Sequence, residues 1–177
     1  MTDSEIAAID PMHMPTGGEL ALLTGFLDYY RAVMVRKAGG LTGEQLAVRL
    51  GPSELALGGL VKHLAFAEDI WFDHRLLGND RGEPWASVDW DADPDWEFHS
   101  AVDDEPEAIC GLYHEACERS RAAVAAVGDL DAVSKLPNGR GVYFSMRWIL
   151  LHMIEETARH TGHADLIRES IDGTTGD

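Results

Sequence analysis

The chain has 177 residues, of which 45% are hydrophobic and 25% charged, and this composition is typical of a globular protein with one domain. Its 31 acidic and 14 basic residues give a net charge of −17, which disfavours nucleic acid and anionic membranes as partners. No apolar run approaches the ~20 residues that span a bilayer, and the acidic start lacks the pattern of a signal peptide.

Residues 1–15 contain two prolines and no clear periodicity, so we expect a loose N-terminal arm. Thr16 precedes Glu19 by three residues, the spacing of a capping box, and predicts the start of a first helix. Large side chains then recur at steps of three and four, as in a packed helix: Leu20, Leu23, Leu27, Tyr30 and Met34. Gly39 and Gly40 are expected to end this helix.

A second helix is predicted from about Glu54 to Leu77, with Ser53 as its N-cap. Leu60, His63, Ala67 and Ile70 lie on one stripe of this helix. Residues 79–103 form a long irregular stretch that contains Trp85, Trp90 and Trp96. Such loops are usually functional or disordered, and three tryptophans argue against disorder. The acidic run from Asp89 to Glu97 indicates a solvated loop.

Pro106 in a first turn and Gly128 at the end predict a third helix over about 104–128. Cys110 and Cys117 lie ~10 Å apart along it, too far to form a disulfide. Reduced thiols fit a cytoplasmic protein. A fourth helix should run from about Ser145 to Ile171. Four helices of about twenty residues predict an all-α protein, an up-down-up-down four-helix bundle over residues 16–173.

The seam of the fourth helix, which is the stripe of side chains that should face the core, carries polar residues where apolar ones are expected. Its positions follow steps of four and three: Ile149, Met153, Glu156, His160, His163 and Ile167. A carboxylate and two imidazoles facing a core are costly unless they are paired or bind a metal. The sequence therefore points to a metal site inside the bundle.

Glu156 and His160 are four residues apart, so their side chains project together from consecutive turns. Metal sites in bundles use inward Glu and His from facing helices, and His63 on the second helix is the best third ligand. Three protein ligands leave one position open, as in catalytic zinc sites, with nickel, cobalt or iron as alternatives to zinc. By spacing, His160 with His163 is also a plausible pair. His152 lies just off the seam.

Two stretches resemble a known family. LVKHLAFAEDIWF at 60–72 and LLHMIEETARHTGHADLIRES at 150–170 closely resemble the signature segments of the DinB-like superfamily. The closer resemblance is to its actinobacterial branch, which includes mycothiol-dependent S-transferases and maleylpyruvate isomerase. That branch carries Glu-x3-His on its last helix, which matches Glu156 and His160, and a histidine on helix two, which matches His63. This resemblance favours Glu156 and His160 over the alternative pair with His163.

The resemblance implies a homodimeric, DinB-like (YfiT-like) bundle with one metal held by His63, Glu156 and His160. It further implies a transferase that uses mycothiol or a related thiol to attack an electrophile in detoxification or secondary metabolism. His163 or His152 would then orient a ligand or move a proton as catalytic residues, and the tryptophan-rich loop could cover the pocket. Two alternatives remain open, a metal-dependent hydrolase and a non-catalytic metal-binding stress protein.

Overall fold

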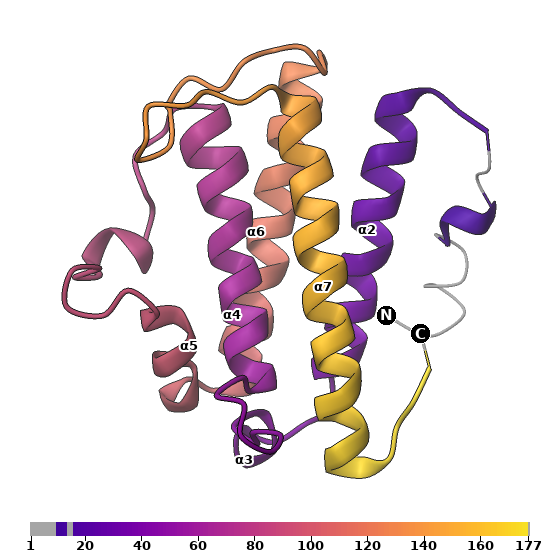
Figure 1. The fold of residues 1–177 in the computed structure, drawn as a ribbon, viewed down its shortest axis with the longest axis vertical. Helices are drawn as coiled ribbons and strands as arrows, with labels where there is room; N and C mark the ends of the chain where they lie inside the picture. The colour runs from indigo at the N-terminus through magenta and orange to yellow at the C-terminus, as the bar shows by residue number, and fades with distance from the viewer. Residues whose placement is uncertain (1–9, 14–15, 177) are drawn as a thin grey trace.

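The structure is a computed structural model that describes residues 10–13 and 16–176, and all its regular elements are helical. Four long helical segments lie side by side (Figure 1): α2 (Glu19–Ala38), α4 (Leu57–Glu68) continued by the π-helix η2 (Asp69–Leu76), α6 (Pro106–Val127) and α7 (Met146–Asp172). Shorter helices are η1 (Pro11–His13), α3 (Gly43–Leu46), η3 (Trp85–Ser87), α5 (Trp96–Ser100) and η4 (Ala101–Asp103). The predicted all-α class is confirmed. Most of the expected N-terminal arm lies outside the described residues.

The helices α4 and α6 run in the same direction. Near the start of both, Lys62 pairs with Asp104, and near the end of both, Asp69 pairs with Arg119 at 2.9 Å. The segment between them, which contains α5, returns the chain along the outside of α4 to its starting level (Figure 1). The prediction of alternating directions assumed short connections, and this connection is long.

The helices α2 and α7 also run in the same direction, because Glu19 pairs with Arg147 at 2.8 Å and Lys37 pairs with Asp165 at 2.6 Å. Both run opposite to α4 and α6 (Figure 1). In chain order the directions are therefore down, up, up and down. The predicted up-down-up-down order is wrong, although the predicted long helices are present.

Two predicted helix starts are wrong. The N-cap of α2 is Gly18, with no side-chain cap, so Thr16 does not form the expected capping box. A capping box occurs instead at Thr42, whose hydroxyl accepts from the backbone of Gln45 at 3.3 Å to open α3. The helix α4 begins at Leu57, because Ser53 Oγ accepts from the nearby backbone N–H of Leu55 and forms a local turn.

The two later helices match their predicted ends. Ser145 caps α7 by accepting from the backbone N–H of Trp148 at 3.2 Å. Gly128 and Gly173 end α6 and α7 at φ of 64° and 76°, values that glycine adopts without the strain imposed by a Cβ.

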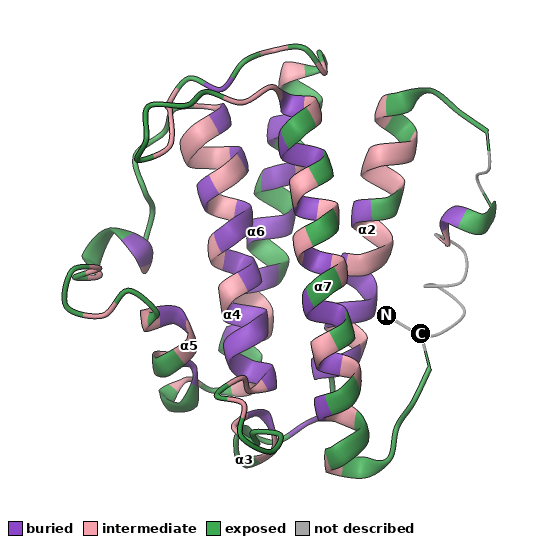
Figure 2. Ribbon diagram, in the orientation of Figure 1, coloured by how far each residue is buried: buried purple, intermediate pink, exposed green. Residues whose placement is uncertain are grey.

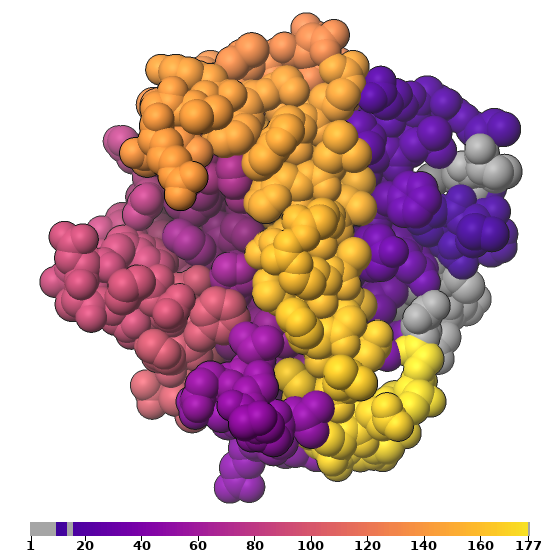
Figure 3. Space-filling view, viewed as in Figure 1, coloured from indigo at the N-terminus to yellow at the C-terminus, as the bar shows by residue number. Residues whose placement is uncertain are grey.

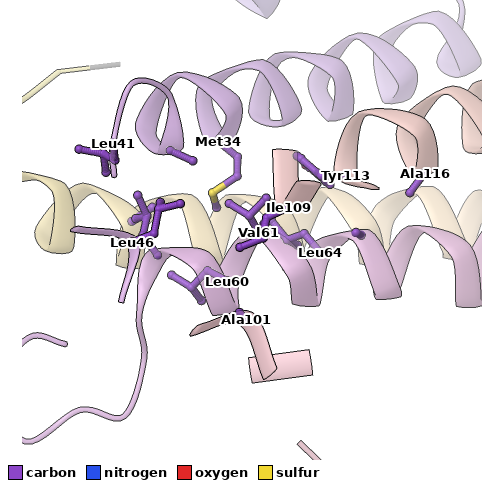
Figure 4. Packing of buried hydrophobic residues seen from close by; sticks show 14 of the residues in the cluster. Met34, Leu41, Leu46, Leu60, Val61, Leu64, Ala101, Ile109, Tyr113 and Ala116 are labelled. Carbon is purple, nitrogen blue, oxygen red and sulfur yellow. The ribbon is translucent and has the colours of Figure 1, made fainter. Parts of the chain in front are cut away.

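The core lies between the long helices, whose inward faces are buried and outward faces exposed (Figure 2). Leu60, Val61 and Leu64 of α4 are at most 1% exposed and pack with Met34 of α2 and with α6 (Figure 4). The burial of these aliphatic side chains is the main stabilising contribution and fixes α4 against its neighbours. No helix in the described residues is both long and apolar enough to cross a membrane.

Candidate metal centre

His63 on α4 and Glu156 and His160 on α7 converge in the structure. The Nε2 atoms of both histidines lie 3.2 Å from the same oxygen, Glu156 Oε1. Three donor atoms, one from each residue, all fall within 4.8 Å of one another, and this is the one such group of His, Cys, Asp or Glu among the described residues. Their side chains are 19%, 14% and 10% exposed, so the group lies just below the surface.

Local structure explains the convergence. Glu156 and His160 are one turn apart on α7, so their side chains lie over each other. The helix α4 runs opposite to α7 and presents His63 to both, with the rings of His63 and His160 5.0 Å apart. Met153 and Ala164, on the same helix as the pair, are fully buried and hold this face of α7 against the core.

A second group of residues surrounds His63 and comes from α5. Glu97 Oε1 lies 2.9 Å from His63 Nδ1, and the ring of Phe98 stacks on the imidazole with centroids 4.6 Å apart. Gly59, one turn before His63, permits this approach, because a Cβ there would lie 3.2 Å from the Phe98 ring and 3.3 Å from its backbone. The glycine thus brings α5 against α4 and fixes the ring of His63 from two sides.

Sequence reasoning missed Glu97 and Phe98. Glu97 ends an acidic run that predicted a solvated loop, yet it is only 4% exposed. The uninterrupted stretch Trp96–Ser100, free of glycine and proline, was the available signal for a short helix.

The electrostatics of the centre favour a cation. Hydrogen bonds with His160 and then His63 hold the pKa of Glu156 well below its usual range. Burial lowers the pKa of His63, but hydrogen bonds with Glu156 and Glu97 outweigh this effect and raise it to about 9. Glu97 Oε2 is buried without a hydrogen-bond partner among the described residues. Without an ion the proton on His63 offsets part of the negative charge, and a divalent ion bound to the neutral imidazoles would take the place of that proton.

The donor set also fits a metal by geometry. Nitrogen and oxygen ligands held ~2.1 Å from a tetrahedral zinc are about 3.4 Å apart, close to the 3.2 Å found here. The Nδ1 atoms of both rings face outer partners, Glu97 for His63 and His163 for His160, which leaves both Nε2 atoms for the ion. Metal-bound histidines in proteins have such outer partners.

The two further histidines occupy different places. His163 Nδ1 lies 3.3 Å from His160 Nδ1, beside the group of three but outside it. His152 lies one turn before Glu156 and packs on Trp71 and Trp148, with centroids 4.8 and 5.0 Å away. Burial lowers the pKa of both His152 and His163, which favours the neutral form of each imidazole.

The tryptophan-rich segment packs on α4. Trp85 is 1% exposed, lies 5.1 Å from the ring of Phe66 and donates to Asp69 at 2.8 Å. Trp90 stacks on the same phenylalanine at 4.6 Å. These tryptophans anchor the segment, whose contacts with His63 come from Glu97 and Phe98.

Comparison with protein families adds an independent observation, because residues 22–173 match the family described as Mycothiol-S-transferase. The chain belongs to this family. The matched range contains the whole of α4, α6 and α7, and with them all three members of the group. The resemblance found in the two signature segments is therefore confirmed. No curated protein is similar enough to the chain to count as a match.

Proposed function

We propose that the protein is a metal-dependent transferase in which mycothiol, or a related low-molecular-weight thiol, attacks an electrophile. Membership of the Mycothiol-S-transferase family supports the thiol and the class of reaction. The observation that carries the metal dependence is the convergence of His63, Glu156 and His160 on one point beneath the surface. Zinc suits two nitrogens and an oxygen, and nickel, cobalt and iron remain alternatives.

Each residue of the centre has a distinct part in this proposal. The Nε2 atoms of His63 and His160 and one oxygen of Glu156 hold the ion. Arg159 Nη1 lies 3.1 Å from the second oxygen of Glu156 and steadies that carboxylate. Glu97 keeps the His63 ring in its orientation through Nδ1. A divalent ion held by these residues would supply positive charge that favours the thiolate form of the cosubstrate near neutral pH.

The transfer forms a sulfur–carbon bond and releases the proton of the thiol. The thiol sulfur forms a bond to the electrophilic carbon, and the leaving group departs with its electron pair. In an addition to a carbon–carbon double bond, the electron pair of that bond instead moves to the neighbouring carbon, which takes a proton from solvent. The proton of the thiol passes to His152 or His163, imidazoles beside the centre whose neutral form is favoured, and from there to solvent. A homodimeric and cytoplasmic enzyme remains a prediction of the sequence.

Metal analysis of the purified protein with mycothiol-dependent conjugation of monochlorobimane tests this proposal. His160→Ala should lose both the bound metal and the conjugation. His114→Ala, which removes an exposed histidine from α6, should keep both and serves as the matched control. Equal metal content in wild type and His160→Ala would refute the assignment of the site. Full conjugation after complete removal of metal would refute the metal dependence.

A further inference from the structure

A cluster of aromatic rings lies beside the metal centre, where α4 and η2 pack against α7. We name it the aromatic wall, and it consists of Trp71 of η2, Phe144 just before α7, and Trp148 and His152 of α7. The Trp148 ring lies 4.3 Å from Phe144, 5.2 Å from Trp71 and 5.0 Å from His152, on which it stacks. Trp148 is 42% exposed although Phe144 and His152 flank its ring, so the wall presents part of this ring to solvent.

The wall begins one helical turn from the metal centre. His152 precedes Glu156 by four residues and Trp71 follows His63 by eight, which correspond to about 6 and 12 Å along the helices. Ala67, halfway between His63 and Trp71, carries only a methyl group. On the face in Figure 3, α4 is recessed between α7 and the 129–144 segment. The wall and the centre thus adjoin on one face.

Arg75 extends the wall with a positive charge. Its guanidinium lies 4.1 Å from the centroid of the Trp71 ring. Burial and then nearby Arg81 lower the pKa of Arg75. Within residues 16–176 no carboxylate pairs with Arg75. Seven other arginines do pair with acids: Arg31, Arg49, Arg119, Arg121, Arg147, Arg159 and Arg168. Arg81 and Arg140 have no carboxylate partner among the described residues either, but both are exposed, whereas Arg75 is half-buried.

An arginine that is half-buried, stacked and free of carboxylates keeps its N–H donors for an external anion. A net charge of −17 repels anions from the surface as a whole. A local cation without an acidic partner is therefore where an anionic group finds favourable contacts. The exposed ring edges of tryptophan and histidine beside it favour an aromatic body, since aromatic pairs also pack edge to face.

We infer that the aromatic wall and Arg75 form the subsite for the electrophile, and that this subsite selects planar aromatic electrophiles bearing a carboxylate or similar acid group. The ring packs against the exposed edges of Trp148 and His152, the acid group pairs with Arg75, and the reactive carbon points between α4 and α7 toward the metal centre. This inference rests on the proposed function, because it assigns a substrate class to the same site.

Two pairs of synthetic compounds separate ring recognition from acid recognition. The unreactive pair is 3,5-dinitrobenzoate and 1,3-dinitrobenzene, and the reactive pair is 4-chloro-3,5-dinitrobenzoate and 1-chloro-2,4-dinitrobenzene. In the reactive pair the thiol sulfur bonds to the ring carbon, the carbon–chlorine bond breaks, chloride leaves with the electron pair and the thiol proton goes to solvent. The members of each pair differ chiefly in the carboxylate.

Calorimetric titration of the metal-loaded protein with the unreactive pair, without thiol, tests the subsite alone. Wild type should bind the benzoate at least tenfold more tightly than dinitrobenzene. Arg75→Gln should weaken the benzoate about 10- to 100-fold and leave dinitrobenzene unchanged, since charge-assisted hydrogen bonds have about that strength. Arg75→Lys should recover part of the loss. Trp148→Ala should weaken both compounds about tenfold.

Two controls match these variants. Arg49→Gln removes the same charge at the opposite end of α4, and Phe26→Ala removes a ring with the same 42% exposure from α2. Both should bind as wild type does. Equal affinity of wild type for the two compounds, or unchanged affinity in both Arg75→Gln and Trp148→Ala, would overturn the inference.

The reactive pair distinguishes this inference from the proposed function. Binding that depends on Arg75, without any mycothiol-dependent release of chloride, would contradict the proposed function and support the subsite. Transfer from both chlorides with equal kcat/KM would support the proposed function and overturn the subsite. Both the proposed function and the subsite are supported if kcat/KM for the chlorobenzoate exceeds that for 1-chloro-2,4-dinitrobenzene at least tenfold in wild type. The two values should then become similar in Arg75→Gln.

Discussion

The carboxylate of Glu97 lies 2.9 Å from Nδ1 of His63, although 34 residues separate the two in the chain. Glu97 is 4% exposed, and its second oxygen is buried without a partner among the described residues. A buried carboxylate in this position raises the basicity of a metal-binding histidine and fixes its ring. Glu97 therefore belongs to the centre even though its oxygen is not one of the three proposed ligands.

Glu97→Gln should lower the affinity for zinc about 10- to 100-fold, because an outer partner of a metal ligand typically contributes that much. Competition with a fluorescent zinc chelator measures the affinity. Glu107→Gln, an exposed carboxylate in the first turn of α6, is the matched control and should bind as wild type does. Unchanged affinity in Glu97→Gln would remove Glu97 from the centre.

Gly59 is the position that allows α5 to reach His63. Gly59→Ala should destabilise the protein and lower its zinc affinity, because the new Cβ would lie 3.2–3.3 Å from Phe98 and displace α5. Gly111→Ala on α6 is the control, since nothing lies within 4 Å of its Cβ position. Alanine there should stabilise the helix by up to ~1 kcal/mol. Urea unfolding and chelator competition measure the two effects, and equal behaviour of the two variants would contradict the role of Gly59.

A buried ion pair joins α2 to α4 away from the metal centre. Arg31 donates to both oxygens of Glu68 at 2.7 and 2.6 Å, and their side chains are 5% and 0% exposed. Arg31→Met should lower the free energy of unfolding by about 3–5 kcal/mol, because it leaves the Glu68 carboxylate buried and unpaired. Urea unfolding measures this loss.

The double variant Arg31→Met with Glu68→Leu tests whether the unpaired carboxylate causes this loss of stability. It removes both charges and should be more stable than Arg31→Met alone. Both proteins should keep wild-type metal content, since neither residue belongs to the group of three. A double variant less stable than Arg31→Met would show that the carboxylate is satisfied by other partners.

The sequence predicted those parts of the molecule that depend on local signals. Ser145, Gly173 and the regular seam between them predicted α7 and its pair Glu156 and His160 within one residue at each end. The capping box predicted at Thr16 was wrong, because the spacing of a capping box also occurs by chance. The N-cap of α2 is Gly18. Local spacing therefore placed Glu156, His160 and His163 on one face of α7, and the family resemblance favoured the pair Glu156 and His160.

Non-local features could not be predicted in this way. The parallel course of α4 and α6 depends on the path of residues 79–105, and no periodicity in the sequence encodes that path. Glu97 reaches His63 only because Gly59 admits Phe98 and with it α5, a contact across 39 residues that spacing rules do not treat. The outer partners of the centre thus emerged only from the packing.

The chemistry of the two cysteines leads to a final prediction. Burial, and then Glu107, raise the pKa of the half-buried Cys110, and burial, and then Glu68, raise the pKa of Cys117, which is 3% exposed. A raised pKa leaves less thiolate at pH 8, and the thiolate is the reactive form. Both residues should therefore react more slowly with iodoacetamide than a free cysteine does, as mass spectrometry of the intact protein would measure.

The same reasoning predicts that the reacting thiol belongs to the cosubstrate. Cys110→Ser should keep mycothiol-dependent conjugation within about twofold of wild type, because a weakly ionised thiol makes a poor nucleophile. Unfolding in urea should expose both cysteines to complete alkylation, which controls for reagent quality. Loss of conjugation in Cys110→Ser with unchanged unfolding would place the nucleophile on the protein. Retained conjugation leaves the external thiol as the group that attacks beside His63, Glu156 and His160.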